Sequence, residues 1–190
     1  MYINVSRAPS PQVARPPWYG DAPWSIDTVS RVGIFEVPSG NFTTAGTWDV
    51  ANHVIYMPIL LRAQKTAYAG WFIPGATGTG NVLIGLYDKD GNQLATTGSF
   101  AHGTTAAPKV QAFTASAVCK PGLYYIAMSF SNNTDTVYQH TVAAPISVAM
   151  GVLQEQPGSF TLPSPATFAI SQTLANPPVC GISTDSTVTT

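Results

Sequence analysis

The segment 88–92, with the sequence DKDGN, carries the side chains of this chain that are best suited to holding a metal ion. A calcium loop of the EF-hand type needs carboxylate or amide ligands at its first, third and fifth positions, glycine at the sixth and glutamate at the twelfth. Counting from Asp88, the sixth position is Gln93 and the twelfth is Ser99, and the glycine comes one residue early. The spacing therefore favours a solvated hairpin turn over a calcium site.

A second segment with possible chemistry is the glycine-rich stretch that contains Gly75, Gly78 and Gly80. A phosphate-binding loop needs a helix behind it, because the free N–H groups at the helix N-terminus hold the anion. Here the residues that follow predict a strand, and no Gly-Lys-Ser or Gly-Lys-Thr sequence is present. The pattern predicts a structural loop, and we expect no nucleotide cofactor.

The histidines and carboxylates lack the spacing of a catalytic or metal site. The three histidines, at positions 53, 102 and 140, match neither HxxxH nor HExxH, and there is no GxSxG elbow. The two facing carboxylates that a glycan hydrolase needs could come from Asp49, Asp88, Asp90 and Asp135. Three of these four lie in turn contexts, where aspartate is common for backbone reasons. We therefore predict no catalytic residue, no cofactor and no metal ligand, and a glycan hydrolase is the least favoured alternative.

The elements that would position any site are β-strands. In the segments 82–87 and 124–130, apolar side chains alternate with others, which is typical of strands half buried against a core. One face of the segment 82–87 carries Val82, Ile84 and Leu86, and one face of the segment 124–130 carries Tyr124, Ile126, Met128 and Phe130. Further strand signals occur at 32–37, 48–62, 67–73, 93–99, 112–116 and 136–142, and Pro58 marks a bulge or a sheet edge. With no persuasive amphipathic helix, this spacing predicts an all-β fold, an antiparallel β-sandwich or jelly roll.

The sequence divides into three parts: an extended Pro/aromatic-rich arm (1–28), a β-sandwich domain (29–145) and an irregular Pro/Ser/Thr-rich C-terminal segment (146–190). Proline fixes φ and lacks a donor, so the arm cannot be a regular helix or a central strand. We predict that the arm binds a partner through Tyr2, Ile3, Trp18, Tyr19 and Trp24. The alternative is an arm folded back on its own domain.

The composition bears on partners. Charged residues make up only 9% of the chain, against about 25% in ordinary soluble domains. No apolar run approaches the ~18 residues that span a bilayer, so we expect no membrane contact and infer a surface covered by further copies of the chain. The alternative is a solvated surface rich in Thr, Ser, Asn and Gln. The net charge of −1 and the scattered lysines predict no nucleic-acid binding.

Two further features of the sequence concern the compartment and the aromatic residues. The N-terminus shows no secretory signal, which predicts assembly in a cytoplasm, and Cys119 and Cys180 are expected to be free thiols, although pairing between them stays open. Tyr68 and Trp71 lie on a predicted strand and could stack on a sugar ring. Aromatic residues on strands more often pack in a core or a subunit interface.

Four segments together resemble the β-sandwich modules of tailed-bacteriophage virion proteins. They are YMPILL, AYAGWFI, NVLIGLYDKDGNQLATTG and KPGLYYIAMSF, and they lie within about 56–131, roughly 40% of the chain. In such modules a leucine precedes the Pro-Gly turn, whereas here Val118 and Cys119 occupy that place. The resemblance brings no catalytic residues. It implies a non-enzymatic component of the head or tail, often a trimer whose N-terminal arms dock on the shell.

Two classes of function follow from this resemblance. The first is capsid decoration or cementing, with further copies of the chain, the major capsid protein or tail proteins as partners, and the virion as location after assembly in the host cytoplasm. The second is a tail or fibre adsorption module that binds host-surface glycans through Tyr68 and Trp71. We favour decoration, because the chain is short and lacks the coiled-coil or β-helical shaft expected of a fibre.

Overall fold

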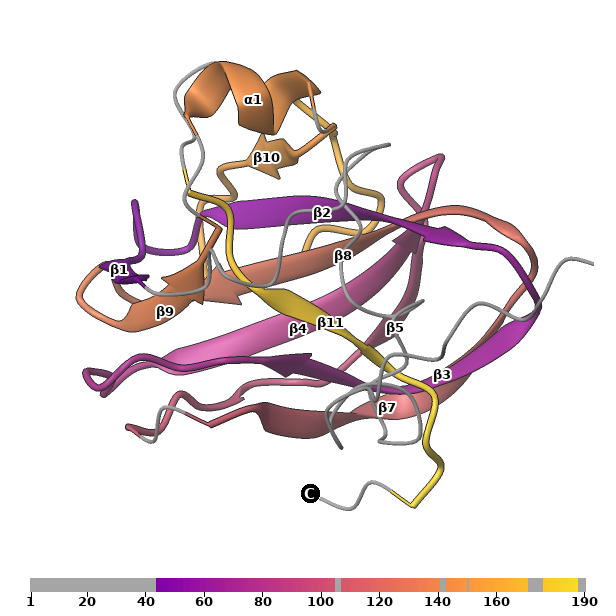
Figure 1. Ribbon diagram of the computed structural model, residues 1–190, viewed down its shortest axis with the longest axis horizontal. Helices are drawn as coiled ribbons and strands as arrows, with labels where there is room; N and C mark the ends of the chain where they lie inside the picture. The colour runs from indigo at the N-terminus through magenta and orange to yellow at the C-terminus, as the bar shows by residue number, and fades with distance from the viewer. Residues whose placement is uncertain (1–43, 105–106, 141–142, 150, 171–175, 188–190) are drawn as a thin grey trace, which may run out of the picture.

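The computed structural model describes residues 44–104, 107–140, 143–149, 151–170 and 176–187, which form three antiparallel sheets, the two larger of them packed face to face (Figure 1). The larger sheet has six strands in the order β10-β2-β8-β4-β5, with β6 also paired to β4; the smaller has the order β11-β3-β7, and β1 pairs with β9. The elements are β1 Thr44–Thr47, β2 Val54–Leu61, β3 Lys65–Phe72, β4 Asn81–Asp88, β5 Gln93–Thr96, β6 Phe100–Ala101, β7 Lys109–Cys119, β8 Gly122–Phe130, β9 Thr136–Gln139, α1 Ala144–Ala149, β10 Leu153–Glu155 and β11 Cys180–Ser183. The predicted all-β class is confirmed, whereas the strand order of a jelly roll stays a prediction.

The core lies between the two sheets and follows the alternation of the sequence. On β4, Val82, Ile84 and Leu86 are fully buried in it, opposite Phe130, Met128 and Ile126 of β8. From the smaller sheet, Phe72, Phe113 and Ile182 complete this cluster. The predicted faces of both segments are thus confirmed, because period-two patterning can place only one set of side chains toward the core.

Pro58 lies in the middle of β2, which is a single continuous strand where the sequence allowed one or two. On one side Pro58 is paired with Tyr125 of β8. On the other side β10 begins at Leu153, opposite Tyr56, and so does not reach Pro58. Among the described residues β2 is therefore a sheet edge at Pro58, which is one of the two alternatives that the sequence predicted.

The C-terminal segment 146–190 contains regular structure that its sequence did not predict. Its strand β10 adds to the edge of β2, and its strand β11 adds to the edge of β3. The six-stranded and three-stranded sheets therefore each contain strands from before and from after position 145. The three-part division of the chain stays a prediction. The predicted strand at 32–37 lies outside the described residues.

Part of this segment, residues 151–170, crosses the outer face of the larger sheet. Phe168 packs edge-on against Tyr56, with 5.0 Å between ring centroids, and also contacts Tyr125. The Tyr56 hydroxyl donates a hydrogen bond to Glu155, and the Tyr87 hydroxyl donates to the carbonyl of Pro163 at 2.7 Å. The expectation that β4 is only half buried is therefore wrong, since six of its eight residues are buried and Tyr87 lies under this segment.

The two cysteines are free and buried. Cys119 pairs in register with Lys65, near one end of β3, and Cys180 pairs with Phe72 at the other end. Those two positions are seven residues apart, which corresponds to roughly 23 Å at about 3.3 Å per residue, far beyond the ~6 Å between Cα atoms of a disulfide. A bond between these two thiols is excluded in this fold.

Candidate functional site

The hairpin tip at 88–92 is a turn whose ligand-like side chains are occupied by one another. One Asp88 carboxylate oxygen accepts the backbone N–H groups of Asp90 and Asn92 at 2.9 Å, and the other accepts the Asn92 side-chain N–H. Gly91 has φ of 86°, a left-handed conformation that favours glycine. Asn92 points a donor at Asp88 instead of an oxygen toward a cation, so the predicted hairpin turn is confirmed. Although slight burial raises the pKa of Asp88, the hydrogen bonds from Asn92 and Asp90 outweigh it and lower the pKa.

The glycine-rich loop at 75–80 is held by a buried carboxylate. Asp135 is fully buried and accepts the backbone N–H groups of Thr79 and Gly80 at 2.9 and 3.1 Å. The N–H of Gly75 donates to the carbonyl of Thr136. These N–H groups are used inside the protein and do not converge on an anion, as the predicted structural loop requires.

The three histidines occupy separate environments. His53 pairs with Asp49 at 2.5 Å, and the ring of His102 packs between Phe72 and Phe130 while its Nε2 bonds the carbonyl of Thr136. His140 is buried, and burial lowers its pKa to about 4. Within the described ranges no three His, Cys, Asp or Glu side chains lie close enough to hold a metal ion.

The predicted sugar-stacking pair lies on β3. Trp71 is only 5% exposed and Tyr68 is half buried. Stacking on a sugar would require the Trp71 ring to be uncovered, and glycan binding at this pair stays a prediction. The arm residues Tyr2, Ile3, Trp18, Tyr19 and Trp24 lie outside the described residues.

One end of the sandwich carries most of the exposed large apolar side chains. This short-turn end, on the right of Figure 1, consists of the turns 62–64, 89–92 and 120–121 and the strand residues beside them. Six large apolar side chains are exposed in the described chain, and four of them lie here, between 37% and 66% exposed: Leu60, Leu94, Val118 and Leu123. Leu60 and Leu123 are cross-strand partners of β2 and β8 and form a contiguous pair.

The rim of the short-turn end is cationic. Its four basic residues are Arg62, Lys65, Lys89 and Lys120, and its two acidic residues are Asp88 and Asp90, which leaves a net charge of +2. Lys89 and Asp90 form an exposed ion pair at 2.7 Å. An apolar centre with a charged rim is the usual composition of a protein interface.

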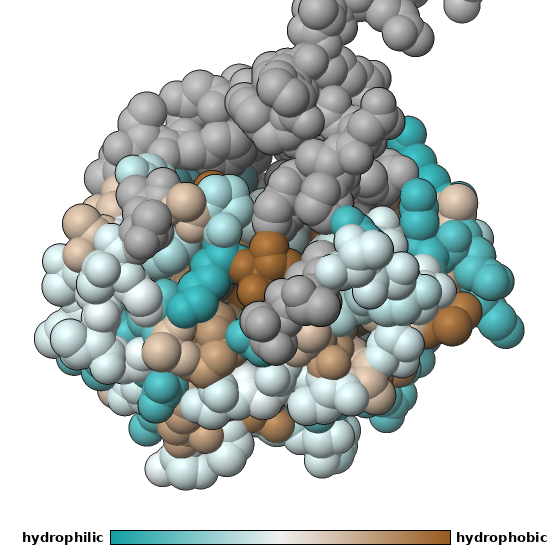
Figure 2. Space-filling model, turned by 90° about the horizontal axis from the view of Figure 1, so that it is seen from below, coloured by the Kyte–Doolittle hydropathy of each residue, from teal (hydrophilic) through white to brown (hydrophobic). Residues whose placement is uncertain are grey.

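Figure 2 shows the molecule from the side of β3 and β7. The described residues visible from this side are mostly hydrophilic or neutral, with a hydrophobic area near the centre of the view. The strand β7 exposes Thr114, Ala115 and Ser116 in its middle and Val118 near its end.

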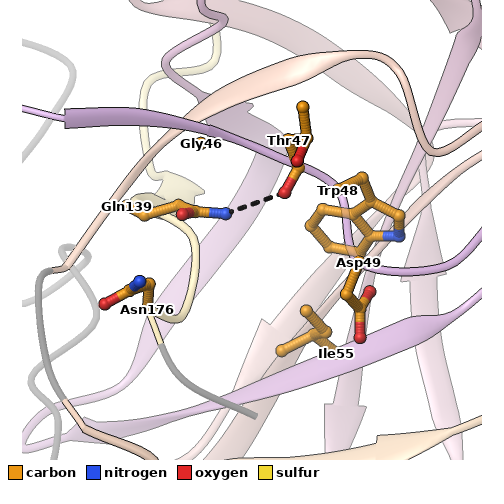
Figure 3. Close-up of a pocket in the computed structure, with 7 residues that line it drawn as sticks. All are labelled: Gly46, Thr47, Trp48, Asp49, Ile55, Gln139 and Asn176. Carbon is orange, nitrogen blue, oxygen red and sulfur yellow. Dashed lines mark hydrogen bonds between the residues drawn. The ribbon is translucent and has the colours of Figure 1, made fainter.

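The opposite end contains a hollow of about 360 Å³ (Figure 3). We call it the long-loop end, formed by the connections 48–53, 73–80 and 131–135 on the left of Figure 1. The described residues that line the hollow are Gly46, Thr47, Trp48, Asp49, Ile55, Gln139 and Asn176. Aromatic and aliphatic surface therefore lies beside amide, hydroxyl and carboxylate groups.

Comparison with known proteins assigns no role to either end of the sandwich. No protein-family model matches the chain, and no curated protein is significantly similar to it in sequence. Among the described residues no helix is long and apolar enough to cross a membrane. The sequence reasoning had not identified either end, because both are assembled from residues that lie far apart in the chain.

Proposed function

We propose that this protein is a non-enzymatic structural component of a bacteriophage virion, which decorates or cements the capsid surface through subunit–subunit contacts. The observation that carries the proposal is the short-turn end, where Leu60 and Leu123 form an exposed cross-strand pair. The resemblance of residues 56–131 to virion β-sandwich modules supplies the kind of particle. The low charge content of 9% agrees with a chain that covers much of its surface with partners.

The short-turn end has the features of a contact surface of moderate strength. Burying the exposed half of each leucine contributes about 1 kcal/mol, so the Leu60–Leu123 pair contributes about 2 kcal/mol before the cost of association. The cationic rim favours a partner surface that is acidic around an apolar centre. In the proposed assembly this partner is a shell subunit.

The N-terminal arm provides a second contact in this proposal. Residues 1–28 contain five prolines together with Trp18 and Trp24, and prolines reduce the entropy lost when an extended segment is ordered on a surface. Two weak contacts on one chain bind a particle far more tightly than either alone, through effective concentration. Assembly of the chain as a homo-oligomer, for example a trimer, would multiply this effect.

Quantitative mass spectrometry of purified virions tests the proposal first. A decoration protein is present in many copies per particle, and particles stripped of it lose resistance to heat or salt that returns when it is added back. A few copies per particle, or a purified protein that stays monomeric and does not bind stripped particles, would contradict the proposal.

A matched pair of variants then tests the surface. Leu123→Asp places a charge at the short-turn end, whereas Ile170→Asp places the same charge at an exposed apolar residue elsewhere. We expect Leu123→Asp to weaken binding to stripped particles at least tenfold, because burying an unpaired carboxylate is costly, and Ile170→Asp to leave it unchanged. Equal effects of the two variants would remove the short-turn end from the proposal.

A further inference from the structure

The register of the smaller sheet places one group of side chains on the face that points away from the core. Gly70 and Phe72 of β3 point inward, since Phe72 belongs to the core cluster and a Cβ on Gly70 would overlap Ile84 of β4. Their neighbours Ala69 and Trp71 therefore point outward, together with the residues paired to them on β7 and β11. This group, which we call the outer patch, consists of Ala69, Trp71, Val110, Ala112, Gly181 and Ser183.

The composition of the outer patch is that of a contact surface. Trp71 is the one large side chain of the six, and it lies between Gly181 on one neighbouring strand and Val110 on the other. None of the six residues carries a charge. Such a face is suited to packing against an apolar segment.

Although it points away from the core, the centre of the outer patch is buried. Trp71 is only 5% exposed, and Ala69 and Ser183 are fully buried. Among the described elements, the main contacts of β3 and β11 beyond their own sheet are with β4 and β8, which lie on the inner side. Because this burial arises within a single chain, another part of the same chain accounts for it.

One part of the chain outside the described residues is long enough to cover neighbouring strands. The range 1–43 contains 43 residues, whereas the other such ranges contain five residues or fewer. Those short ranges are 105–106, 141–142, 150, 171–175 and 188–190. The C-terminal tail also continues from Ser183 past Ala69, away from Trp71.

The described part of the chain begins close to the outer patch. Thr44 pairs with Gln139 of β9, and Gln139 forms a bridge to Pro178, three residues before Gly181. Three strand spacings of about 4.8 Å and three residues of about 3.3 Å each then separate Thr44 from Trp71, which is roughly 17 Å. Six residues in an extended conformation cover about 20 Å, which is enough for this distance.

We propose that residues 29–43 pack on the outer patch, with the segment 32–37 over Trp71. The six residues 38–43 supply the length of the connection to Thr44. The sequence of 32–37 is VGIFEV, which contains a single charge and matches the apolar character of the patch. Residues 1–28 remain outside this contact.

The proposal does not depend on the virion function. The outer patch belongs to the smaller sheet, whereas Leu60 and Leu123 belong to the larger one, and residues 1–28 stay available to bind a particle. Loss of the cover over Trp71 would leave the Leu60–Leu123 pair in place. Failure to bind stripped particles would leave the cover over Trp71 in place.

The first test measures how accessible Trp71 is in the full-length protein. The indole N–H signal of Trp71 is assigned in NMR spectra with Trp71→Phe, and its relaxation by a soluble gadolinium chelate is recorded. Combining Ile34→Asp with Phe35→Asp places charges on both faces of the segment 32–37. We expect this variant to increase the relaxation of the Trp71 signal several-fold, because a charged segment cannot pack on an apolar face without a large cost.

A matched variant in the arm serves as the control. Combining Trp18→Asp with Trp24→Asp should leave the Trp71 signal as protected as in the native protein. Trp48, which is 1% exposed in the core, should stay protected in both variants. The proposal is overturned if the charges at positions 34 and 35 leave Trp71 protected, or if the charges in the arm uncover it.

The second test needs only one substitution and decides the matter even if the charged variants unfold. A nitroxide label is attached to Ile34→Cys in the full-length protein, where Cys119 and Cys180 are buried and so do not compete for it. We expect the label to broaden the Trp71 signal, and reduction of the nitroxide to restore it. Absence of broadening overturns the proposal. So does broadening in a mixture where label and isotope are on different chains, since a second copy would then supply the cover.

Discussion

The two ends of the sandwich are made from the same strands, but one end exposes apolar side chains and the other buries polar ones. At the short-turn end, leucines and a valine are exposed, while at the long-loop end a charged Asp135 and two histidines, His102 and His140, are buried. The difference follows from the connections. The turns 62–64 and 120–121 contain three and two residues, too few to fold back over the strand ends.

The connections at the long-loop end are long enough to cover the strands. Residues 73–80 and 131–135 fold inward and bring backbone N–H groups close to side-chain acceptors such as Asp135 and Asn132. Buried loop backbone requires such partners, because an unpaired N–H away from water is costly. Polar groups at this end are therefore structural, and apolar groups at the short-turn end are left for contact with something else.

The largest expected effect comes from removing the carboxylate that organises the long-loop end. Asp135→Ala leaves the N–H groups of Thr79 and Gly80 without their acceptor and creates a cavity, so the free energy of unfolding should fall by about 3 kcal/mol in urea denaturation. The control is Asp90→Ala at the short-turn end, where the ion pair with Lys89 is exposed to solvent and its loss should change stability little. Similar losses in both variants would remove the contrast between the ends.

As the pH falls, the long-loop end should lose stability before the rest of the domain. Burial lowers the pKa of His140 from 6.5 to about 4, so the unfolded chain binds this proton at a higher pH than the folded protein does. Stability is therefore lost as the pH falls from about 6.5 to 4, by up to about 3 kcal/mol. Amide hydrogen exchange at pH 5 should increase around residues 136–140 before it increases in the core of β4.

The short-turn end should respond only at lower pH. The lowered pKa of Asp88 contributes stability that is present above the pKa of the unfolded chain, near 3.8, and is lost as the pH falls through the lower value of the folded protein. If the amides of residues 88–92 lost their protection from hydrogen exchange at a higher pH than those of residues 136–140, the predicted order in which the two ends lose stability would be wrong.

A smaller effect is expected from the hairpin tip itself. Asp88→Ala removes the acceptor for three N–H groups that remain in contact with water, and should cost about 1 kcal/mol in thermal or urea unfolding. Asp88→Asn keeps one oxygen in place for the turn and should recover most of that loss. Without this recovery, the turn would depend on the charge of Asp88 and not on its geometry.

The smallest effect on stability is expected from the exposed leucines. Leu60→Ser and Leu123→Ser should each change the free energy of unfolding by about 0.5 kcal/mol or less, because both side chains already face solvent. The same variants should lower self-association or particle binding, measured by analytical ultracentrifugation and by co-sedimentation with stripped particles. A loss above about 2 kcal/mol would mean that these leucines stabilise the domain itself.

The sequence was informative wherever one strand or one turn is self-contained. The alternation of Val82, Ile84 and Leu86 predicted their burial, and the spacing within 88–92 predicted a turn instead of a calcium site. The segment 146–190 was expected to be irregular, because its prolines and small polar residues show no period. Its strands β10 and β11 have only three and four residues and exist because they complete sheets formed elsewhere.

By itself, the sequence determined the all-β class, the buried faces of β4 and β8 and the hairpin between β4 and β5, since each depends on neighbours within about ten residues. Tertiary structure alone decided what the two ends are. Leu60 and Leu123 meet only through the register of β2 on β8, and Gly46, Gln139 and Asn176 meet only where β1, β9 and the C-terminal segment converge. The physical reason is that side-chain periodicity states which face is apolar, whereas strand register and loop length decide which faces are brought together and which are left uncovered.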